Sequence, residues 1–214
     1  MILNGVLRPY GEIAAETERS IRASVDIEGR SYVCVSFRVA GFSGGVRIPD
    51  PSTAVAQVRS QEQLRFAEAT RLWLAGATSG IDIPAASDVG RADGLWRSTC
   101  FEVFARLRDG RYAEFNISPS GEWAAYGFSD YREGRADLNG PIRVVRAEWS
   151  GDVFELDAMV DWRDWPFIER IGLSAVIEDI DGNLSYWALA HPSDKPDFHH
   201  PDSFTLTLPP VEPV

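Results

Sequence analysis

The sequence predicts an all-β fold, an antiparallel β-sandwich with one or two short helices, in a single domain spanning residues 1–214. Short runs rich in Val, Ile, Phe, Tyr and Thr recur along the chain, separated by clusters of Gly, Asp, Asn and Ser, which is typical of sandwiches. Strands alternating with long helices, which would indicate a parallel sheet, are missing. A chain of 214 residues is also long enough to bury a core without disulfides or metals.

The clearest pair of strands lies in residues 99–118. Apolar and polar residues alternate over 101–107 up to the turn at Asp109-Gly110, and a second β-rich run, 112–117, follows that turn. An Asp-Gly pair between two such runs predicts a β-hairpin. The turn at 118–121 then leads into another expected strand, which covers residues 123–128.

The other expected elements rest on similar patterns. Further strands are expected at 32–39, 144–149, 153–160, 173–178, 184–189 and 204–208. Residues 60–76 are rich in Gln, Glu, Ala and Leu, and their apolar positions recur at roughly helical spacing, so a helical insertion is expected there. Asp164 to Ile171 is expected to add one helical turn.

The net charge of the chain limits the classes of partner that it is expected to bind. There are 21 Lys and Arg residues against 32 Asp and Glu residues, which gives a formal net charge of -11. Nucleic-acid binding needs a basic face that releases counterions, and anionic membranes attract basic segments, so neither partner is expected. The composition leaves the oligomeric state open.

The location is expected to be cytoplasmic. No run approaches the roughly 18 apolar residues that a membrane-spanning helix needs. The first residues lack the basic start and long apolar stretch of a secretory signal. Cys34 and Cys100 lie among β-forming residues, which favours two buried thiols over a disulfide.

Common enzyme motifs are missing. Lys195 is the only lysine, and its surroundings hold no phosphate-binding loop. Ser120 lacks the Gly-x-Ser-x-Gly setting of a nucleophile elbow. Glu102 and Glu114 lie on the two arms of the 99–118 hairpin and could be neighbours, as glycoside hydrolysis requires of two carboxylates. The sequence favours the alternative, two polar residues in a ligand groove or on a solvated face.

Metal sites are weakly indicated. Asp179, Asp181 and Asn183 resemble part of a calcium loop, but the distal glutamate of that motif is missing, and a simple Asp-Gly-Asn turn is favoured. The three histidines, His191, His199 and His200, fall within ten residues and match no zinc spacing. Their expected role is contact with a ligand from a partly exposed loop.

Aromatic residues are the strongest functional signal. They occur in segments rich in Gly, Pro, Ser, Arg and Asp, where a sandwich presents loops or a groove: Trp96, Trp123, Tyr126, Tyr131, Trp187 and Phe198. Flat rings stack on the apolar faces of sugars, while nearby polar side chains bind the hydroxyl groups. Trp96 and Phe198 are expected to be exposed, and Trp123 and Trp187 are expected to lie in the core.

A family resemblance rests on residues 94–208. The segment Gly94-Leu95-Trp96-Arg97-Ser98-Thr99-Cys100-Phe101-Glu102-Val103-Phe104 resembles family 9 carbohydrate-binding modules and the wider group of DOMON-like ligand-binding domains, bacterial members above all. The similarity continues through residues 112–121, 155–162, 187–192 and 198–204. It implies a β-sandwich that binds a small ligand without catalysis, and it does not extend to the first 90 residues.

The resemblance also implies a ligand groove. In the sugar-binding modules two aromatic rings clamp a sugar, and Trp96 matches the first ring while Phe198 lies where the second, usually Trp, is found. Glu102 matches a polar contact. Asn116 and His199 fall at positions where the modules often have Arg. Two arginines that would donate hydrogen bonds to sugar hydroxyl groups are therefore replaced. Trp187 and His191 are expected nearby.

The expected function is therefore non-catalytic binding of a small molecule, most plausibly a carbohydrate. The alternatives are a haem-binding redox domain, since some DOMON-like domains bind haem through Met or His, and a glycan-active hydrolase. Met159 lies within an expected strand without an obvious partner for His191, which places haem second. No cofactor is expected, with haem or calcium as the candidates.

Overall fold

The computed structural model describes residues 1–11, 19–27, 32–42, 46, 90–139, 142–165 and 167–210. The expected helix at residues 60–76 lies outside them. The strands are β1 (Ile2–Pro9), β2 (Ser20–Ile27), β3 (Tyr32–Ala40), β4 (Cys100–Leu107), β5 (Tyr112–Ile117), β6 (Trp123–Phe128), β7 (Ala136–Asp137), β8 (Ile142–Ser150), β9 (Val153–Asp161), β10 (Ile168–Glu178), β11 (Leu184–Ala188) and β12 (Leu206–Thr207). Two short 3-10 helices complete the described elements, η1 (Leu95–Arg97) and η2 (Pro201–Ser203).

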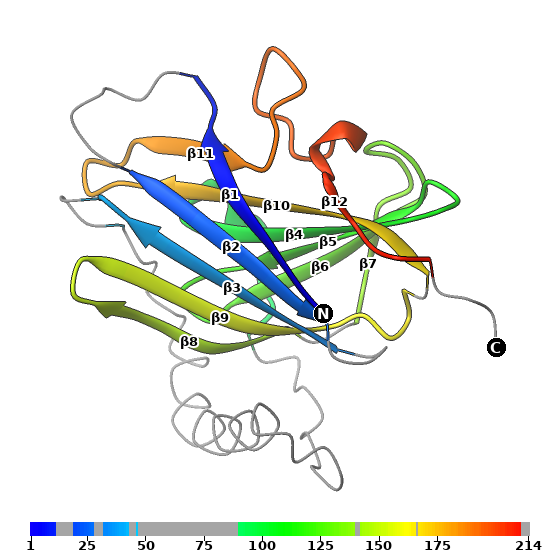
Figure 1. The fold of residues 1–214 in the computed structure, drawn as a ribbon, viewed down its shortest axis with the longest axis horizontal. Helices are drawn as coiled ribbons and strands as arrows, with labels where there is room; N and C mark the ends of the chain where they lie inside the picture. The colour runs from blue at the N-terminus through cyan, green and yellow to red at the C-terminus, as the bar shows by residue number, and fades with distance from the viewer. Residues whose placement is uncertain are drawn as a thin grey trace, which may run out of the picture.

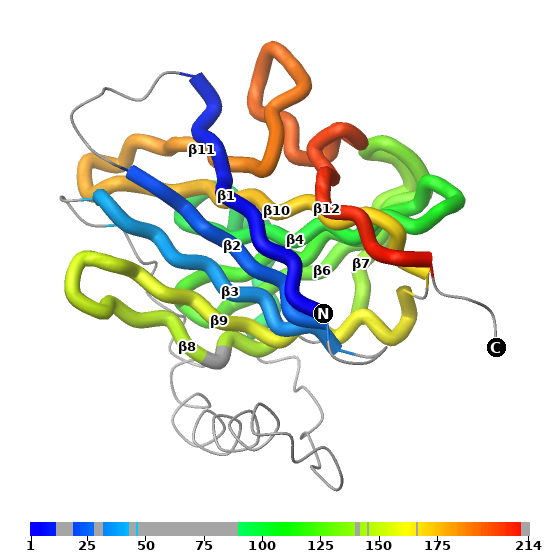
Figure 2. Tube along the Cα trace, viewed as in Figure 1, coloured from blue at the N-terminus to red at the C-terminus, as the bar shows by residue number. Residues whose placement is uncertain are grey.

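The strands form a curled antiparallel sandwich, so the all-β prediction is confirmed (Figure 1). The front layer in Figure 1 has the order β1-β2-β3-β9-β8, and the second layer has the order β7-β6-β5-β4-β10-β11. β1 also pairs with β11 at its end, which joins the two layers. Figure 2 shows how segments far apart in sequence lie side by side, with the blue β3 next to the yellow-green β9.

Strand periodicity explains the core. In β4, Phe101 and Val103 point between the layers and are fully buried. Their neighbours Glu102 and Phe104 point to the opposite face of the same sheet, because successive side chains alternate. Both faces of this sheet are covered, and every residue of β5 and β6 is buried. The second layer therefore separates the core from the site described below.

The N-terminal strands and the 164–171 segment differ from the sequence prediction. The sequence did not predict β1 and β2, which pair with each other over Ile2 to Leu7. The prediction of a helical turn at 164–171 is wrong, because residues from Ile168 onward belong to β10. A register shift between Ile168 and Arg170 lets Ile168 and Ile171 both be buried, so a strand with a bulge mimics helical spacing.

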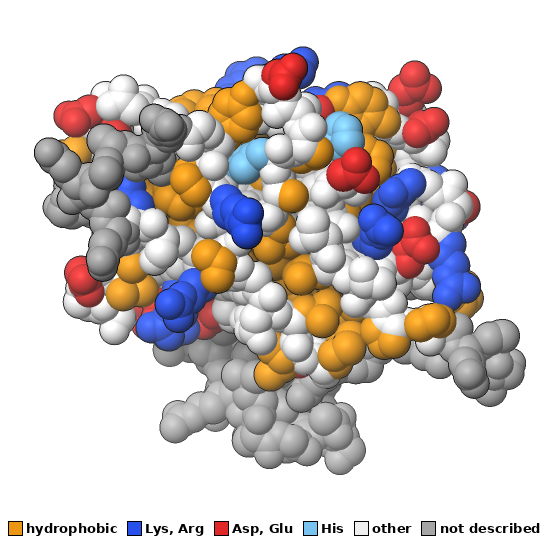
Figure 3. All heavy atoms as spheres, turned by 45° about the horizontal axis from the view of Figure 1, so that its top comes forward, with side chains coloured by type: hydrophobic (Ala, Val, Ile, Leu, Met, Phe, Trp, Pro, Cys, Tyr) orange, Lys and Arg blue, Asp and Glu red, His pale blue; other side chains and the backbone are white. Residues whose placement is uncertain are grey.

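The remaining predicted features are placed as follows. The closing strand expected at 204–208 is shortened to β12, which pairs with the start of β10. Cys100 is buried and Cys34 only half-buried, and both are thiols. Within the part of the chain that the structure describes, no helix has the length and apolar character needed to cross a membrane. On the face in Figure 3, hydrophobic, arginine, acidic and histidine side chains are interspersed.

Candidate functional site

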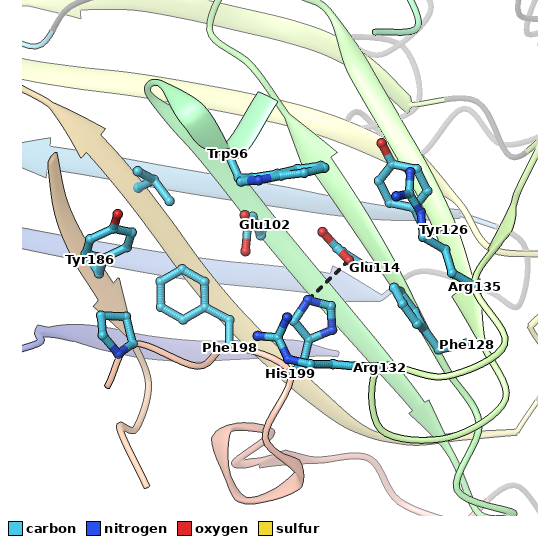
Figure 4. Close-up of a pocket in the computed structure, with 12 residues that line it drawn as sticks. Trp96, Glu102, Glu114, Tyr126, Phe128, Arg132, Arg135, Tyr186, Phe198 and His199 are labelled. Carbon is cyan, nitrogen blue, oxygen red and sulfur yellow. Dashed lines mark ion pairs between the residues drawn. The ribbon is translucent and has the colours of Figure 1, made fainter. Parts of the chain in front are cut away.

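A pocket of about 360 Å³ lies on the outer face of the second layer (Figure 4). The strands β4, β5, β6, β10 and β11 provide its floor, and η1 together with the loops at 129–135 and 189–200 provides its walls. It is lined by Trp96, Glu102, Glu114, Tyr126, Phe128, Arg132, Arg135, Val176, Tyr186, Pro196, Phe198 and His199. Rings and charged groups thus meet in one concave surface, the usual character of a small-molecule site.

Two carboxylates form part of the floor. The register pairs Glu102 with Asn116 and Phe104 with Glu114, so the two glutamates are diagonal neighbours on one face. Their exposed fractions are 3% for Glu102 and 5% for Glu114. Ser174 Oγ donates to Glu102 Oε2 at 3.1 Å, and Asn116 Nδ2 donates to Glu114 Oε1 at 2.7 Å. The strand register and these two side-chain hydrogen bonds thus hold two buried carboxyl groups in fixed positions.

Burial and mutual repulsion determine the charge of this pair. Burial and, after it, the charge of Glu114 raise the pKa of Glu102 to about 8, against the opposing effects of the hydrogen bond from Ser174 and of Arg132. Burial also raises the pKa of Glu114, opposed by its hydrogen bond from Asn116 and by Arg135 and Arg132. At neutral pH Glu102 therefore keeps its proton in most molecules.

Aromatic rings surround the carboxylates. Trp96 lies on η1, above Glu102 in Figure 4, and it meets Tyr126 edge-on with ring centroids 6.3 Å apart. Gly94 precedes η1 with φ 78°, a left-handed conformation that favours glycine. Ser98 Oγ donates to Glu178 Oε2 at 2.7 Å and attaches this segment to β10. Trp96 thus keeps 37% of its surface exposed at the pocket on an anchored segment.

His199 reaches the floor from the C-terminal loop. Its Nδ1 lies 2.9 Å from Tyr112 Oη, and Tyr112 Oη accepts the backbone N–H of Arg132 at 3.0 Å. Tyr112 Oη therefore donates its proton to Nδ1, and the ring hydrogen of neutral His199 lies on Nε2. Nε2 is 3.6 Å from Glu114 Oε2, as the dashed line in Figure 4 marks. Burial, with help from Arg132, lowers the pKa of His199 to about 4, so the ring is neutral at pH 7.

Asp197 connects the two loops that form the pocket wall. It is buried, and its carboxylate accepts hydrogen bonds from Tyr131 Oη, from Arg132 Nη2 at 2.8 Å and from the His199 backbone N–H at 3.2 Å. Burial raises the pKa of Asp197, but the bonds from Tyr131 and Arg132 outweigh this and leave it below its usual range. The carboxylate therefore positions both Arg132 and His199.

Asp197→Asn is expected to lower the free energy of unfolding by about 1–3 kcal/mol, because the buried carboxylate loses the charge that strengthens its hydrogen bonds from Tyr131 and Arg132. Urea denaturation followed by tryptophan fluorescence measures the change. Asp194→Asn is the matched control, since Asp194 is an exposed residue of the same loop. Equal stabilities of the two variants would contradict the role given to Asp197.

The structure places the sequence-predicted residues in two groups. Four line the pocket, namely Trp96, Glu102, Phe198 and His199. Three do not, namely Trp187, Asn116 and His191. Trp187 is 1% exposed and packs on Phe42 in the core, because its neighbour Tyr186 takes the pocket-facing position of β11.

The other two residues support the pocket from outside its surface. Asn116 is fully buried and donates to Glu114, so it orients a floor carboxylate. His191 Nε2 lies 2.8 Å from the Arg8 carbonyl oxygen, and its ring meets Tyr10 edge-on. Its centroid is 6.4 Å from that of Phe198, so it lies behind the Phe198 ring.

Several lining residues were missing from the predicted groove. Glu114 had been considered only as a partner of Glu102, and the register also sets it opposite Tyr126. Alternation from Glu114 through the two hairpins could have identified Tyr126 and Phe128. Arg132 and Arg135 lie in a loop without strand periodicity, so the sequence carries no signal for their position.

The metal and cofactor candidates can be compared with the described residues. The Asp179 carboxylate accepts from the backbone N–H groups of Asp181 and Asn183 at 3.0 and 2.9 Å, so the segment has the geometry of a turn. Among the residues that the structure describes, no three His, Cys, Asp or Glu side chains are grouped to hold a metal ion. Met159 is buried on β9, in the other layer from His199.

Comparison with known proteins gives one structural likeness. No protein-family model matches the chain, and no curated protein matches it in sequence. A crystal structure described as that of a putative carbohydrate-binding protein from Bacteroides uniformis aligns with a TM-score of 0.55. The alignment covers 95% of this chain and 84% of that chain at 14% identity. At this identity the likeness concerns the fold, and the finer assignment to DOMON-like domains stays a prediction.

Proposed function

We propose that the protein binds a carbohydrate in this pocket without catalysing a reaction. The observation that supports the proposal most directly is the combination of exposed Trp96 with buried polar groups beneath it. A sugar ring has an apolar C–H face and an equatorial belt of hydroxyl groups. An indole wall over fixed carboxylates offers a partner to each of them.

The floor and walls supply hydroxyl partners of both kinds. Glu102 and Glu114 accept hydrogen bonds, while His199 Nε2–H and the guanidinium of Arg132 donate. Burial of most of these groups means that few rotamers have to be fixed when a ligand binds, which favours affinity. The Bacteroides uniformis protein of similar fold is itself described as a putative carbohydrate-binding protein, which supports the proposal.

The placement of the carboxylates favours binding over hydrolysis. A glycosidase holds its two carboxyl groups on either side of the scissile bond, so that one protonates the leaving oxygen while the other acts at the sugar carbon. Glu102 and Glu114 instead lie diagonally on adjacent strands of one floor. A sugar stacked on Trp96 would meet both of them from the same side.

Trp96→Ala is expected to weaken sugar binding by about 1–3 kcal/mol, the range for ring stacking on an aromatic side chain. A panel of mono- and disaccharides is first screened by thermal shift. The affinity of the best sugar for the native chain and the variant is then measured by isothermal titration calorimetry.

Trp149→Ala provides the matched control. Trp149 is 38% exposed, close to the 37% of Trp96, but it lies on β8 in the other layer. Its loss should leave affinity unchanged. If Trp96→Ala binds as well as this control while its circular dichroism stays native, the stacking role of Trp96 is wrong.

A further inference from the structure

Each floor carboxylate has one oxygen available to a ligand. Ser174 satisfies Glu102 Oε2, and Asn116 satisfies Glu114 Oε1. Among the described residues, no hydrogen bond reaches Glu102 Oε1 or Glu114 Oε2, and both side chains line the pocket. Only His199 Nε2 approaches, at 3.6 Å from Glu114 Oε2, which is beyond hydrogen-bond distance. A ligand donor could therefore bind to both oxygens.

The cations around the pocket are already balanced by other groups. Arg132 pairs with Asp197 at 2.8 Å, and Arg135 lies 3.7 Å from Asp93 with its guanidinium 3.9 Å from the Tyr126 ring centroid. Across the described ranges, no arginine or lysine nitrogen lies within 4.0 Å of either floor carboxylate. The nearest basic group is His199, which is neutral at pH 7 because burial and the charge of Arg132 lower its pKa to about 4.

No other titratable group nearby provides a positive charge. Burial raises the pKa of Cys100, which is on the same face of β4 as Glu102, and that of Tyr112 to about 12, so both are neutral at pH 7. The groups that face the floor from the surrounding elements are Cys100 on β4, Tyr112 on β5, Tyr126 on β6, Tyr186 on β11, Arg132 and Arg135 in the 129–135 loop, and His199 in the C-terminal loop. Arg132 and Arg135 act on Glu114 from beyond 4.0 Å, so no cation pairs directly with either floor carboxyl group.

We propose that the ligand is an amino sugar and that its ammonium group is held by Glu102 and Glu114. This inference rests on the proposed function and specifies the class of carbohydrate that the pocket binds. An ammonium group has three N–H donors, so it can donate to both open carboxylate oxygens while one N–H remains for solvent. Its charge also offsets the repulsion between the two carboxylates that arises once Glu102 has given up its proton.

The aromatic rings around the two glutamates are also suited to binding an ammonium group. Trp96, Tyr126, Phe128 and Phe198 line the pocket around the carboxylates, and the faces of such rings attract cations. An anionic sugar would instead have to draw Arg132 and Arg135 away from Asp197 and Asp93 while approaching two glutamates. The pocket therefore favours a positive ligand over a negative one.

The proton balance gives the inference a distinct signature. In the free protein Glu102 carries a proton in most molecules, because its pKa is raised to about 8. When a ligand ammonium binds, its charge replaces that proton, which passes to the solvent. A neutral sugar brings no charge and leaves the proton in place. Amino-sugar binding should therefore release a fraction of a proton, and glucose binding should release none.

The experiment titrates the native chain with glucosamine, glucose, N-acetylglucosamine and glucuronate at pH 7. Calorimetry in two buffers of different ionisation enthalpy, neither containing a primary amine, reports the protons released. Glucosamine is expected to bind about tenfold more tightly than glucose, the gain of one charge-assisted hydrogen bond. N-acetylglucosamine, which has the same ring without the charge, should lose that advantage.

Two variants test the residues. Glu114→Gln should lower the glucosamine-to-glucose affinity ratio, because one of the two ammonium acceptors is lost, and Glu102→Gln should abolish proton release, because it removes the group that carries the proton. Glu148→Gln, an exposed glutamate on β8, should keep the ratio of the native chain. Circular dichroism verifies folding of all three variants, and the native-chain comparison stands even if one of them fails to fold.

The outcomes separate the inference from the proposed function. Glucose or glucuronate binding as tightly as glucosamine, or glucosamine binding without proton release, would overturn the amino-sugar inference while carbohydrate binding stands. Failure of every sugar in the titration to bind would overturn the proposed function and the inference with it.

Discussion

Phe101→Ala should lower the free energy of unfolding by about 3–5 kcal/mol, the usual cost of removing a large ring from a packed core. Phe101 lies on β4 and is fully buried. Its ring centroid is 4.8 Å from that of Phe37 on β3 and 6.3 Å from that of Phe154 on β9. Because both partners belong to the opposite layer, the substitution leaves a cavity where the two sheets are held together.

Chemical denaturation in urea measures this loss. Phe167→Ala is the matched control, because Phe167 is 59% exposed and its truncation should change stability by no more than about 0.5 kcal/mol. The denaturant slope should stay unchanged in both variants, since each unfolds the same surface. A Phe101→Ala chain as stable as the control would contradict the placement of this ring between the layers.

The hairpins were predictable because their turn chemistry is local. Asp109-Gly110 and Asp181-Gly182 each connect two strands, as the sequence indicated. β1 was not predictable on the same grounds, since its centre contains Asn4-Gly5, a pair that usually marks a turn. There Gly5 has a packing reason instead, because a Cβ at this position would lie 2.4 Å from the Leu189 side chain. Only the fold brings β1 against that residue.

The site was predictable in part. For strand residues, the alternation of side chains between the two faces of the sheet decides which ones reach the pocket. Glu102 could be placed because the hairpin fixes its face. Trp187 was expected in the core but close to the groove, and the structure buries it while its neighbour Tyr186 faces the pocket. Arg132 has φ 57°, an uncommon conformation for a residue other than glycine, and its position depends on Asp197 and Tyr112. Such tertiary contacts leave no periodic trace in the sequence.

Glu102→Gln should stabilise the protein at pH 8 by an amount on the order of 3 kcal/mol relative to the native chain. Burial and the charge of Glu114 raise the pKa of Glu102 from 4.5 to about 8 in the folded state. Below pH 4.5 the carboxyl is protonated in both the folded and unfolded chain, so it imposes no penalty. As the pH rises from 4.5 to 8, the unfolded chain ionises freely while the folded chain resists, and stability falls.

A glutamine at this position has nearly the same shape as glutamate and does not ionise. The free energy of unfolding of the Glu102→Gln variant should therefore not fall in this way as the pH rises. Its amide oxygen can still accept from Ser174 Oγ, which preserves the contact that positions the side chain. Urea denaturation at several pH values between 4.5 and 8 should show the native and Glu102→Gln curves diverging as the pH rises. Glu148→Gln, at an exposed position on β8, controls for the loss of one carboxylate from an acidic chain. Parallel curves for all three proteins would mean that Glu102 ionises as easily folded as unfolded, and that the pocket floor is open to water.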